Sequence, residues 1–592
     1  MARSLKLAPP RVEVEDRPDG TRIVRSPVPL GESARCVTEW LTRWARERPT
    51  ATFLTEPGPQ EVQRVSYAEA RAAVVAMAGG LLDRGASVDR PVMILSDNSI
   101  EHALLSLAAQ HIGVPAVPVS PAYSLMSSDH AKLRAIFELV RPSVVFAEDH
   151  DAYGPALAAL DLDGVTVLGP EGGTTATGSV LRDTTLDDSV GRAHDAVGPD
   201  TVAKVLFTSG STGEPKGVMN THGMLTSNQQ MIAQCWPFLD DTRPVLVDWL
   251  PWNHTFGGNH NFNMVLRNGG VLHINHGKPV PALVEKTVAR LREVSPTLYF
   301  DVPRGFAVLL PHLEEDDELA ARFFANLDLV FYAGAALPQN LWDRMEALSA
   351  RIRGEPVMMV SAWGATETSP LVTSVHFPIP RAGVIGLPAP GCEIKLVPNA
   401  GKLEMRVRGP NVTPGYLRRP DLTLEAFDDE GFYEIGDAGR FEDPEHPERG
   451  LVFDGRVAES FKLTTGTWVH AGNLRVALVA ALDPVAQDVV ITGHDRDEVG
   501  ALIFAHATEW DRADDPVAIV RAGLAAHDAR ASGSSQRVTR ALVLDEPPSI
   551  DAGEITDKGY VNQRRVLERR ADQVERLYAG GDGVITLDRG VD

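Results

Sequence analysis

The segment Thr208-Ser-Gly-Ser-Thr-Gly-Glu-Pro-Lys-Gly217 directly follows the apolar run at 204–207, so a predicted strand leads into a loop rich in hydroxyl groups and glycine. Such a loop is suited to hold polyphosphate, because glycine lets backbone N–H groups turn toward an anion, the hydroxyls add donors and Lys216 adds a positive charge. A flexible Ser/Gly linker is the alternative, but linkers seldom follow a buried strand directly and seldom end in Pro-Lys-Gly. We therefore interpret residues 208–217 as a phosphate-binding loop.

The loop does not follow the Walker A pattern of P-loop kinases and GTPases. Counted from Gly210, that pattern requires glycine at position 215 and serine or threonine at position 217, where this chain has Pro215 and Gly217. A P-loop kinase or GTPase is therefore disfavoured.

The loop instead resembles the phosphate-binding signature of the acyl-adenylating superfamily, which includes acyl-CoA synthetases, luciferases and the adenylation domains of peptide synthetases. Further motifs of this superfamily follow in its order, namely Trp363-Gly-Ala-Thr-Glu-Thr368, Gly386-Leu-Pro-Ala-Pro-Gly391, Arg408-Gly-Pro410, Gly415-Tyr416, Gly431-Phe-Tyr-Glu-Ile-Gly-Asp437 and Asp454-Gly-Arg456. The similarity extends from about residue 40 to about residue 567. Chance agreement of so many ordered motifs is negligible.

The composition is typical of a globular protein outside the membrane. Its 592 residues are 43% hydrophobic, enough for several domains with large cores. The 57 basic and 80 acidic residues give a formal net charge of −23, which argues against binding to nucleic acid or to an acidic membrane. Cys36, Cys235 and Cys392 are too widely spaced to indicate a zinc site or a disulfide framework, so we expect a reducing, cytoplasmic location. No run of 18 apolar residues occurs and no apolar stretch follows Met1, so we expect neither a membrane span nor export.

Helix-like and strand-like segments alternate from about residue 67 to residue 210, which predicts an α/β fold with parallel sheets covered by helices. The resemblance implies a large N-terminal domain, residues 1–456, that holds the acid and ATP sites. This domain would consist of parallel-rich sheets flanked by helices plus a β-barrel-like subdomain. The resemblance also implies a small, mobile α+β C-terminal domain, residues 457–592, that acts as a lid and turns about a hinge two residues after Arg456.

Two positions near this hinge depart from the family's pattern. Ala458 stands at the hinge itself, where relatives usually carry Asp or Lys. The loop that corresponds to the family's CoA tunnel contains Thr465, Gly466 and Trp468, and Thr465 replaces the usual glycine, so Gly466 must take over its role. These differences indicate a divergent subfamily.

The resemblance implies that the chain binds ATP, Mg²⁺ and CoA, and that it joins a carboxylate to the α-phosphorus of ATP. Both reactants are anions, so the site must concentrate positive charge and orient the reactants in line. By similarity, the nucleotide contacts Thr208, Ser209, Gly210, Ser211, Thr212, Gly213, Lys216, Gly334, Ala335, Ala336, Trp363, Gly364, Asp437 and Arg456.

By the same resemblance, two neighbouring residues, Thr366 and Glu367, would contact the phosphates and the metal ion. Thr366 would hydrogen-bond the α-phosphate, and Glu367, with Thr208, would bind Mg²⁺ together with phosphate oxygens. A lone acidic residue after threonine is usually solvated or caps a helix, so the assignment of Glu367 depends on its place after Trp363-Gly-Ala.

The ribose and adenine contacts are assigned in the same way. Asp437 would accept hydrogen bonds from the two ribose hydroxyls, and Arg456 would reach the same sugar. A turn residue and a surface arginine are the respective alternatives. The small residues from Ala333 to Ala336 would let an adenine ring lie flat against the backbone, although tight packing explains them equally well.

The catalytic lysine is expected in the C-terminal domain. Gly553-Glu-Ile-Thr-Asp-Lys-Gly559 occupies the region of the family's terminal motif, in which a lysine neutralises charge between the carboxylate oxygen and the α-phosphate. We therefore assign this role to Lys558, and a solvated loop lysine is the alternative.

The acid pocket is expected after another predicted strand, in the stretch 248–258. This stretch supplies aromatic side chains near the place where relatives bind the acyl group, and aromatic faces suit a planar ring. The expected pocket residues are Trp252, His254, Phe256, Ala333 and Gly334. His254 is also a catalytic candidate, with a gating or pocket-lining role. A metal site formed by His254 with His222 and His260 is disfavoured, because no carboxylate or cysteine lies at ligand spacing.

Several stretches, including 220–222, 227–238, 467–469 and 555–560, resemble feruloyl-CoA synthetases more closely than fatty acyl enzymes. Our hypothesis is that ferulate, ATP and CoA give feruloyl-CoA, AMP and pyrophosphate, as an opening step of phenylpropanoid catabolism. The expected partners are thus a small aromatic carboxylic acid, ATP and CoA, with the chain a monomer or homodimer. The alternatives are a ligase for medium-chain or benzoate-like acids, an enzyme that hands acyl-adenylate to a separate carrier protein, and a non-catalytic nucleotide-binding protein.

Overall fold

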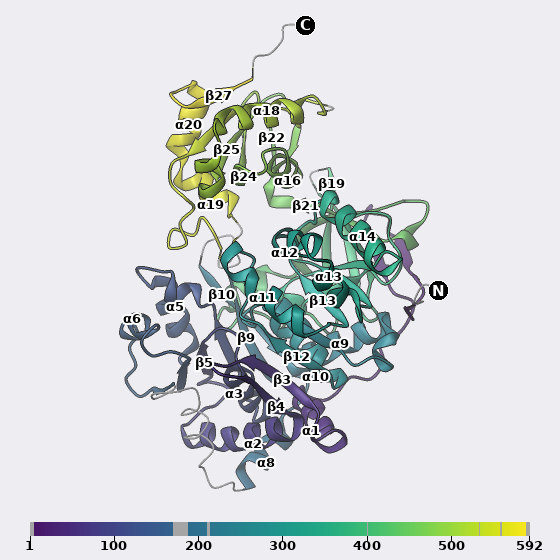
Figure 1. Cartoon of the computed structure of the whole chain (residues 1–592), viewed down its shortest axis with the longest axis vertical. Coiled ribbons are helices and arrows are strands. Elements are labelled where there is room, and N and C mark those ends of the chain that lie inside the picture. The colour runs from purple at the N-terminus through teal and green to yellow at the C-terminus, as the bar shows by residue number, and fades with distance from the viewer. Residues whose placement is uncertain are drawn as a thin grey trace.

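The computed structural model describes residues 5–169, 188–209, 214–399, 401–531, 533–556, 559 and 561–587. Figure 1 shows a large lobe and, toward the C-terminus, a smaller lobe that lies on top of it. The described strands form five sheets with helices packed around them, which confirms the predicted mixed α/β fold. The domain boundary after Arg456 stays a prediction, and strand β21 (Leu451–Arg456) ends at that residue.

The first sheet carries the loop at 208–217 and has the strand order β10-β9-β6-β5-β7-β8. Its strands are β5 (Val92–Leu95), β6 (Ala116–Val119), β7 (Val144–Ala147), β8 (Thr166–Leu168), β9 (Val202–Ser209) and β10 (Pro215–Thr221). Neighbours are parallel except β9 and β10, which form an antiparallel hairpin. This arrangement agrees with the predicted alternation of helices and strands.

Strand β5 shows why this sheet needs helices on both faces. Val92 and Ile94 belong to the core that contains α2 (Tyr67–Asp83) and α3 (Ile100–His111). Met93 and Leu95 point to the other face and belong to the core that contains α5 (Ala131–Val140). A strand buried on both faces reads as a continuous apolar run, as this one does.

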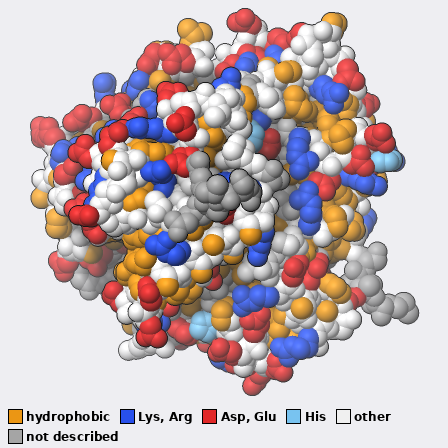
Figure 2. All heavy atoms as spheres, turned by 90° about the horizontal axis from the view of Figure 1, so that it is seen from above, with side chains coloured by type: hydrophobic (Ala, Val, Ile, Leu, Met, Phe, Trp, Pro, Cys, Tyr) orange, Lys and Arg blue, Asp and Glu red, His pale blue; other side chains and the backbone are white. Residues whose placement is uncertain are grey.

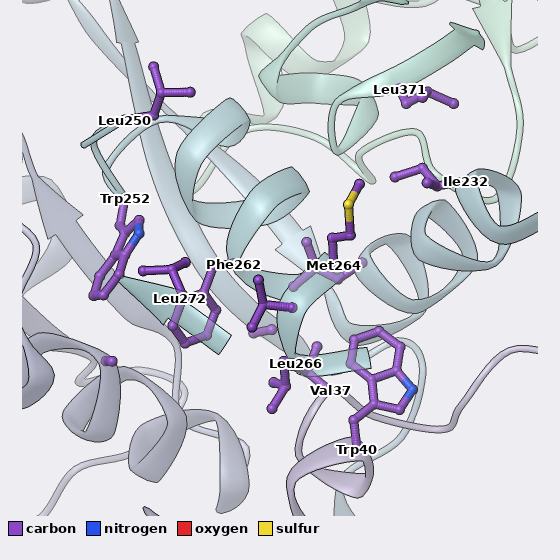
Figure 3. Packing of buried hydrophobic residues seen from close by; sticks show 14 of the residues in the cluster. Val37, Trp40, Ile232, Leu250, Trp252, Phe262, Met264, Leu266, Leu272 and Leu371 are labelled. Atoms are coloured by element: carbon purple, nitrogen blue, oxygen red, sulfur yellow. The ribbon is translucent and has the colours of Figure 1, made fainter. Parts of the chain in front are cut away.

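A second sheet has the order β11-β12-β3-β4 and lies beside the first in the large lobe (Figure 1). It consists of β3 (Thr52–Pro57), β4 (Val62–Ser66), β11 (Val245–Asp248) and β12 (Val271–Ile274), and it packs near α1 (Thr38–Glu47), α9 (His222–Cys235) and α10 (Phe262–Asn268). Figure 3 shows Trp252, Phe262 and Leu272 pointing toward one another in the shared core.

The largest sheet has eleven strands in the order β1-β2-β18-β19-β20-β21-β17-β16-β15-β14-β13. The parallel strands β13 (Leu298–Asp301), β14 (Leu329–Tyr332) and β15 (Met358–Gly364) are covered by α11 (Pro281–Glu293), α12 (Pro303–Glu315), α13 (Asp317–Phe324) and α14 (Gln339–Arg353). The antiparallel part comprises β16 (Leu371–Ser374), β17 (Val384–Pro388), β18 (Glu393–Asn399), β19 (Lys402–Arg408), β20 (Tyr433–Phe441) and β21. The expected barrel-like subdomain is therefore open among the described strands, because β1 and β13 are the two edges of one continuous sheet and no barrel closes.

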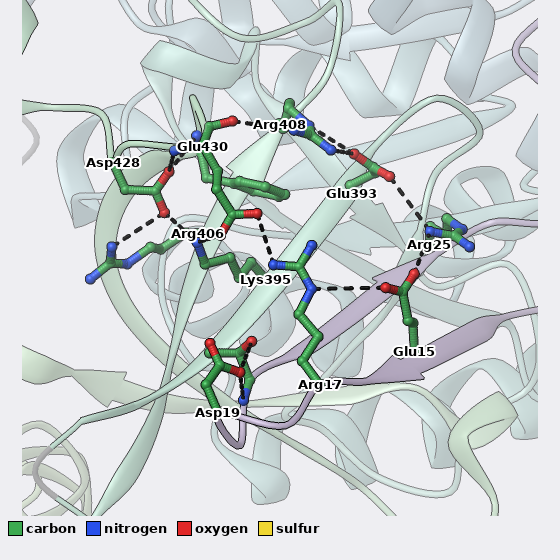
Figure 4. Close-up of polar contacts among 12 residues, drawn as sticks. Glu15, Arg17, Asp19, Arg25, Glu393, Lys395, Arg406, Arg408, Asp428 and Glu430 are labelled. Atoms are coloured by element: carbon green, nitrogen blue, oxygen red, sulfur yellow. Dashed lines mark hydrogen bonds and ion pairs between the residues drawn. The ribbon is translucent and has the colours of Figure 1, made fainter.

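A hairpin near the N-terminus completes this sheet. Strand β1 (Glu13–Asp16) pairs with β2 (Arg22–Arg25), and β2 pairs antiparallel with β18. Ion pairs reinforce the contact, as Figure 4 shows. The Arg17 guanidinium lies 2.8 Å from Glu430, and the Lys395 ammonium lies 2.6 Å from the same Glu430 carboxylate.

The smaller lobe has its own sheets and core. Strands β24 (Ala486–Thr492), β25 (Val499–Ala505), β26 (Val538–Leu544) and β27 (Val584–Thr586) form one sheet, and β22 (Ser460–Lys462) and β23 (Trp468–His470) form a short hairpin. Helices α16 (Ala471–Ala481), α18 (Pro516–Asp528), α19 (Gln563–Arg569) and α20 (Ala571–Ala579) pack around them. The two hydrophobic clusters of this lobe contain only residues beyond 456, so its core is built separately from that of the large lobe.

The surface carries both signs of charge. Figure 2 shows acidic and basic side chains interspersed over the face seen from above. Within the part of the chain that the structure describes, every helix is too short or too polar to span a lipid bilayer.

Candidate active site

The β9–β10 hairpin holds the two ends of the predicted phosphate loop together. Thr208 pairs with Lys216 in the antiparallel register, and Leu417 donates its backbone N–H to the Gly217 carbonyl at 2.7 Å. The Lys216 ammonium lies 5.4 Å from the centre of the Tyr416 ring. The tip of the loop, Gly210, Ser211, Thr212 and Gly213, lies outside the described residues.

Thr366 and Glu367 lie in a short 3-10 helix, Thr366–Thr368, that directly follows β15. The Asn220 side chain donates to the Thr366 carbonyl at 3.3 Å, and the Thr413 N–H donates to the Glu367 carbonyl at 2.8 Å. Since Asn220 belongs to β10, its hydrogen bond ties the helix to the hairpin of the phosphate loop. Gly364 permits the turn, because a Cβ there would lie 1.7 Å from the Pro370 carbonyl oxygen.

The Glu367 carboxylate is buried and oriented by a tyrosine. The Tyr416 hydroxyl donates to its Oε1 at 3.1 Å and lies 3.3 Å from the Tyr433 hydroxyl. No group of three potential metal ligands occurs among the residues that the structure describes. A single carboxylate fits Mg²⁺ that takes its remaining ligands from phosphate oxygens and water, which is a common arrangement for this ion.

Asp437 has one carboxylate oxygen held by a hydrogen bond and one that accepts no hydrogen bond from a described group. The Trp363 indole N–H donates to its Oδ2 at 2.8 Å, and Arg456, opposite it on β21, has its Nε 3.4 Å from Oδ1. No described group donates a hydrogen bond to that buried Oδ1. Burial raises the pKa of Asp437, and the Arg456 charge opposes this rise. A buried acceptor without a donor fits a ligand that brings its own hydroxyl group.

The small-residue run lies at the carboxyl end of β14. Ala333 is half-buried, and its N–H donates to the Asp301 carbonyl at 3.4 Å. Gly334, Ala335 and Ala336 are exposed, and Gly334 has φ = +85°, a conformation that favours glycine. The backbone here is thus open to solvent, as an approach by a flat ligand would require.

The predicted acid-pocket residues do not all point the same way. Half-buried Phe256 packs its ring 5.5 Å from Phe331 and 5.8 Å from His260. The Trp252 ring instead contacts His102 and Phe262 in the core shown in Figure 3. His254 is half-buried, with its Nε2 3.4 Å from the Asn253 side-chain nitrogen. The pocket roles of Trp252 and His254 stay predictions.

Sequence reasoning missed three residues of this region. Phe300 and Phe331 lie on β13 and β14 and join Phe256 and His260 in one ring cluster. Their strands appear in the sequence as apolar runs, which do not reveal the face that each ring occupies. Tyr416, noted in the sequence only as part of a motif, is the residue that orients Glu367.

Of the residues assigned to the CoA tunnel, Thr465 and Gly466 lie in the turn between β22 and β23, and Trp468 is the first residue of β23. Gly466 has φ = +81°, so it takes the conformation that Thr465 would adopt less readily. The Lys462 ammonium lies 4.9 Å from the Trp468 ring centre. Ala458 is exposed in a short 3-10 helix, Val457–Glu459, that directly follows β21.

Lys558 lies outside the described residues, but the segment before it is well anchored. The Glu554 carboxylate is 0% exposed and accepts hydrogen bonds from Arg569 at 2.8 Å and from Arg570 at 2.7 Å. Asp551 accepts hydrogen bonds from the Ser128 N–H and hydroxyl, at 3.1 Å and 2.7 Å, just before α5 of the large lobe. The smaller lobe is therefore docked on the large lobe through this segment.

The fold and these motifs are those of AMP-binding enzymes, and comparison with known proteins agrees. The AMP-binding enzyme family matches residues 41–417, and the C-terminal domain of AMP-binding enzymes matches residues 460–582. The chain belongs to the AMP-binding enzyme family.

Relatives within this family differ widely in their acids. The chain is 26% identical to 3-[(3aS,4S,7aS)-7a-methyl-1,5-dioxo-octahydro-1H-inden-4-yl]propanoyl:CoA ligase of Rhodococcus jostii (strain RHA1), over 73% of this chain and 82% of that protein. It is 28% identical to a feruloyl-CoA synthase of an Amycolatopsis species, over 67% of this chain and 74% of that protein. The fold is similar to that of ATP-bound MatB from Rhodopseudomonas palustris, with a TM-score of 0.67 at 24% identity over 91% of this chain and 99% of that one.

Proposed function

We propose that this chain is a ligase that activates a hydroxycinnamate such as ferulate with ATP and transfers it to CoA. The ring cluster of Phe256, Phe300 and Phe331 carries this proposal. Phe300 and Phe331 lie near the carboxyl ends of β13 and β14, and Phe256 of the π-helix packs against both. Aromatic side chains bind planar aromatic acids well. The similarity to a feruloyl-CoA synthase supports the same acid class.

In the first half-reaction, an oxygen of the substrate carboxylate attacks the α-phosphorus of ATP, and the bond to pyrophosphate breaks. Residues 208–213 and Lys216 would hold the β- and γ-phosphates, and Thr366 would donate to the α-phosphate. Glu367 and Thr208 would hold Mg²⁺, which supplies positive charge beside the phosphate oxygens when bound. Lys558 would neutralise the charge that develops between the two anions.

The same geometry supports the proposed nucleotide contacts. Asp437 Oδ1, which accepts no hydrogen bond from a described group, would accept one from a ribose hydroxyl while the Trp363 indole holds Oδ2 in place. In the second half-reaction, the CoA sulfur attacks the acyl carbon, a thioester forms and AMP leaves. Thr465, Gly466 and Trp468 would line the path of the CoA arm after the lid turns about Ala458.

An equimolar mixture of ferulate, p-coumarate, caffeate, benzoate and octanoate with Mg-ATP and CoA tests the proposal directly. We expect feruloyl-CoA or another hydroxycinnamoyl-CoA as the dominant early product, measured by mass spectrometry. Benzoyl-CoA or octanoyl-CoA as the dominant product would refute the acid class while keeping the ligase activity. Acyl-adenylate without any thioester would refute transfer to CoA and indicate a carrier protein as the acceptor.

A further inference from the structure

His260 occupies an unusual position for an ionisable side chain. It belongs to the π-helix Phe256–Asn261, a rare element that often occurs at functional sites, and its side chain is 1% exposed. Gln229 donates to the His260 carbonyl at 3.0 Å and thereby holds this backbone in place. Burial lowers the pKa of His260 to about 4, so the ring is neutral near pH 7.

The hydrogen bonds around His260 determine which ring nitrogen carries the proton. The Asn261 amide group donates to the Asp248 carboxylate at 3.0 Å, which turns the Asn261 carbonyl oxygen toward His260. That oxygen lies 2.9 Å from His260 Nδ1, so Nδ1 carries the hydrogen and donates it. Nε2 is therefore a hydrogen-bond acceptor.

This acceptor has no described partner. Nε2 is buried and makes no hydrogen bond within the part of the chain that the structure describes. The side chains around the imidazole are mostly apolar rings, since Phe331 stacks on it at 5.1 Å and Phe300 and Phe256 approach by their edges. A buried acceptor left unpaired costs free energy comparable to a lost hydrogen bond, so a ligand that supplies a donor has an advantage here.

We propose that His260 is a specificity-determining residue, whose Nε2 accepts a hydrogen bond from the ring hydroxyl of the bound hydroxycinnamate. The inference rests on the proposed function, because it places the aromatic ring of the acid among Phe256, Phe300 and Phe331. The carboxylate would then point toward the nucleotide, and the hydroxyl at the far end of the ring would reach the imidazole. The neutral tautomer selects for a donor, so a methoxy group at the same position would not replace the hydroxyl.

Three acids that differ at one position test this selection in the wild-type enzyme. p-Coumarate, cinnamate and 4-methoxycinnamate have the same carboxylate and ring, and only p-coumarate has a hydroxyl donor at the para position. We expect kcat/KM for p-coumarate to exceed that for cinnamate and for 4-methoxycinnamate by about 10- to 100-fold, as loss of a hydrogen bond to a buried acceptor requires. Similar kcat/KM values for p-coumarate and cinnamate in the wild-type enzyme would overturn the proposed role of His260.

Two substitutions separate hydrogen bonding from packing. His260→Phe keeps a ring and removes Nε2, and we expect it to bring the p-coumarate to cinnamate ratio close to one. His260→Gln retains a polar atom near the Nε2 position, and we expect it to restore part of the preference. If the ratio of kcat/KM for p-coumarate to that for cinnamate is the same in His260→Phe as in the wild type, the proposal is overturned.

A matched control is His222, whose Nε2 is also buried without a described partner, but which lies outside the ring cluster. His222→Gln should leave the substrate ratio unchanged, whatever its effect on stability. If no phenylpropenoic acid is converted at all, the proposed function fails and the role of His260 fails with it. If these acids are converted without selection for the hydroxyl, only the role of His260 fails.

Discussion

Substitution of Glu554 by Gln is expected to destabilise the C-terminal lobe strongly while barely changing its shape. The carboxylate is wholly buried and accepts hydrogen bonds from Arg570, Arg569 and the Ser549 N–H, at 2.7 Å, 2.8 Å and 3.0 Å. Burial alone would raise the pKa of Glu554, but the hydrogen bonds from Arg570, Ser549 and Arg569 prevail and lower it from 4.5 to about 2.

The fall in the pKa of Glu554 gives the size of the stability loss expected in Glu554→Gln. A fall of about 2.5 in pKa corresponds to about 3 kcal/mol of stability at neutral pH, at roughly 1.4 kcal/mol for each pKa unit. For a lobe of this size we expect the calorimetric Tm of its transition to fall by about 10 °C in Glu554→Gln. The transition of the large lobe should stay unchanged, since Glu554 contacts only residues of its own lobe through these bonds.

The pH dependence checks the reasoning independently. Because the folded-state pKa is lowered, the contribution of Glu554 is complete above pH 4.5 and is lost as the pH falls toward 2. The difference in stability between wild type and Glu554→Gln should therefore narrow below pH 4.5. Glu568→Gln is the matched control, because Glu568 is exposed and pairs with Arg564, and it should cost less than about 0.5 kcal/mol. The role assigned to Glu554 would be refuted if Glu554→Gln lowered the free energy of unfolding by less than about 1 kcal/mol, or if the stability difference between wild type and variant widened as the pH falls.

Three further outcomes are expected. Asp437→Asn should lower kcat/KM for ATP by about 10- to 100-fold because an amide nitrogen would replace one acceptor, whereas Asp443→Asn in an exposed loop should have no such effect in the same steady-state assay. Asp551→Ala should weaken lobe docking by about 1 kcal/mol, seen as faster amide hydrogen exchange at 127–132 and 549–556, and unchanged exchange would contradict the contact. Near pH 5, seven buried groups should together lower the free energy of unfolding by about 4 kcal/mol for each pH unit of acidification, measured by urea titration. Five of them are histidines whose pKa is lowered to about 3 or about 4, which take up protons only when unfolded, and the other two are aspartates whose pKa is raised to about 6 or about 7, which offset two of these protons. The histidines, with pKa values of about 3 or about 4, are His102, His111, His222, His260 and His273, and the aspartates, at about 6 and about 7, are Asp248 and Asp301. A urea midpoint that stays constant between pH 6 and pH 5 would contradict this count.

The sequence predicted those features that depend on local patterns. The strand that leads into the loop at 208–217 was predicted from an apolar run, and β9 confirms it. The pairing of β9 with β10 and the 3-10 helix at Thr366 were not predicted. The family resemblance implied only that Asp437 and Arg456 reach the same ribose, and the strand register that places them opposite each other was not predicted.

Features that depend on contacts between distant segments could not be predicted in this way. Glu367 and Tyr416 are far apart in the sequence, and nothing near either one indicates that they meet. Trp252 stands in an aromatic stretch beside Phe256, yet the chain turns its ring into the core toward Phe262. The aromatic composition of residues 248–258 predicted a ring-binding region, which stays a prediction, whereas the direction of each ring is decided by the packing of β13, β14 and the π-helix.

The N-terminal hairpin has a consequence for how the protein should be produced. Residues 13–25 precede the segment that the family shares, yet β2 covers the outer side of β18 along four residue pairs. A recombinant protein that starts at residue 41 would leave the N–H and C=O groups of β18 that face β2, at residues 393–396, unpaired, and it would leave Glu430 without Arg17. Exposed strand edges of this kind template association with other chains, so such a truncated protein is expected to aggregate even with its active site intact.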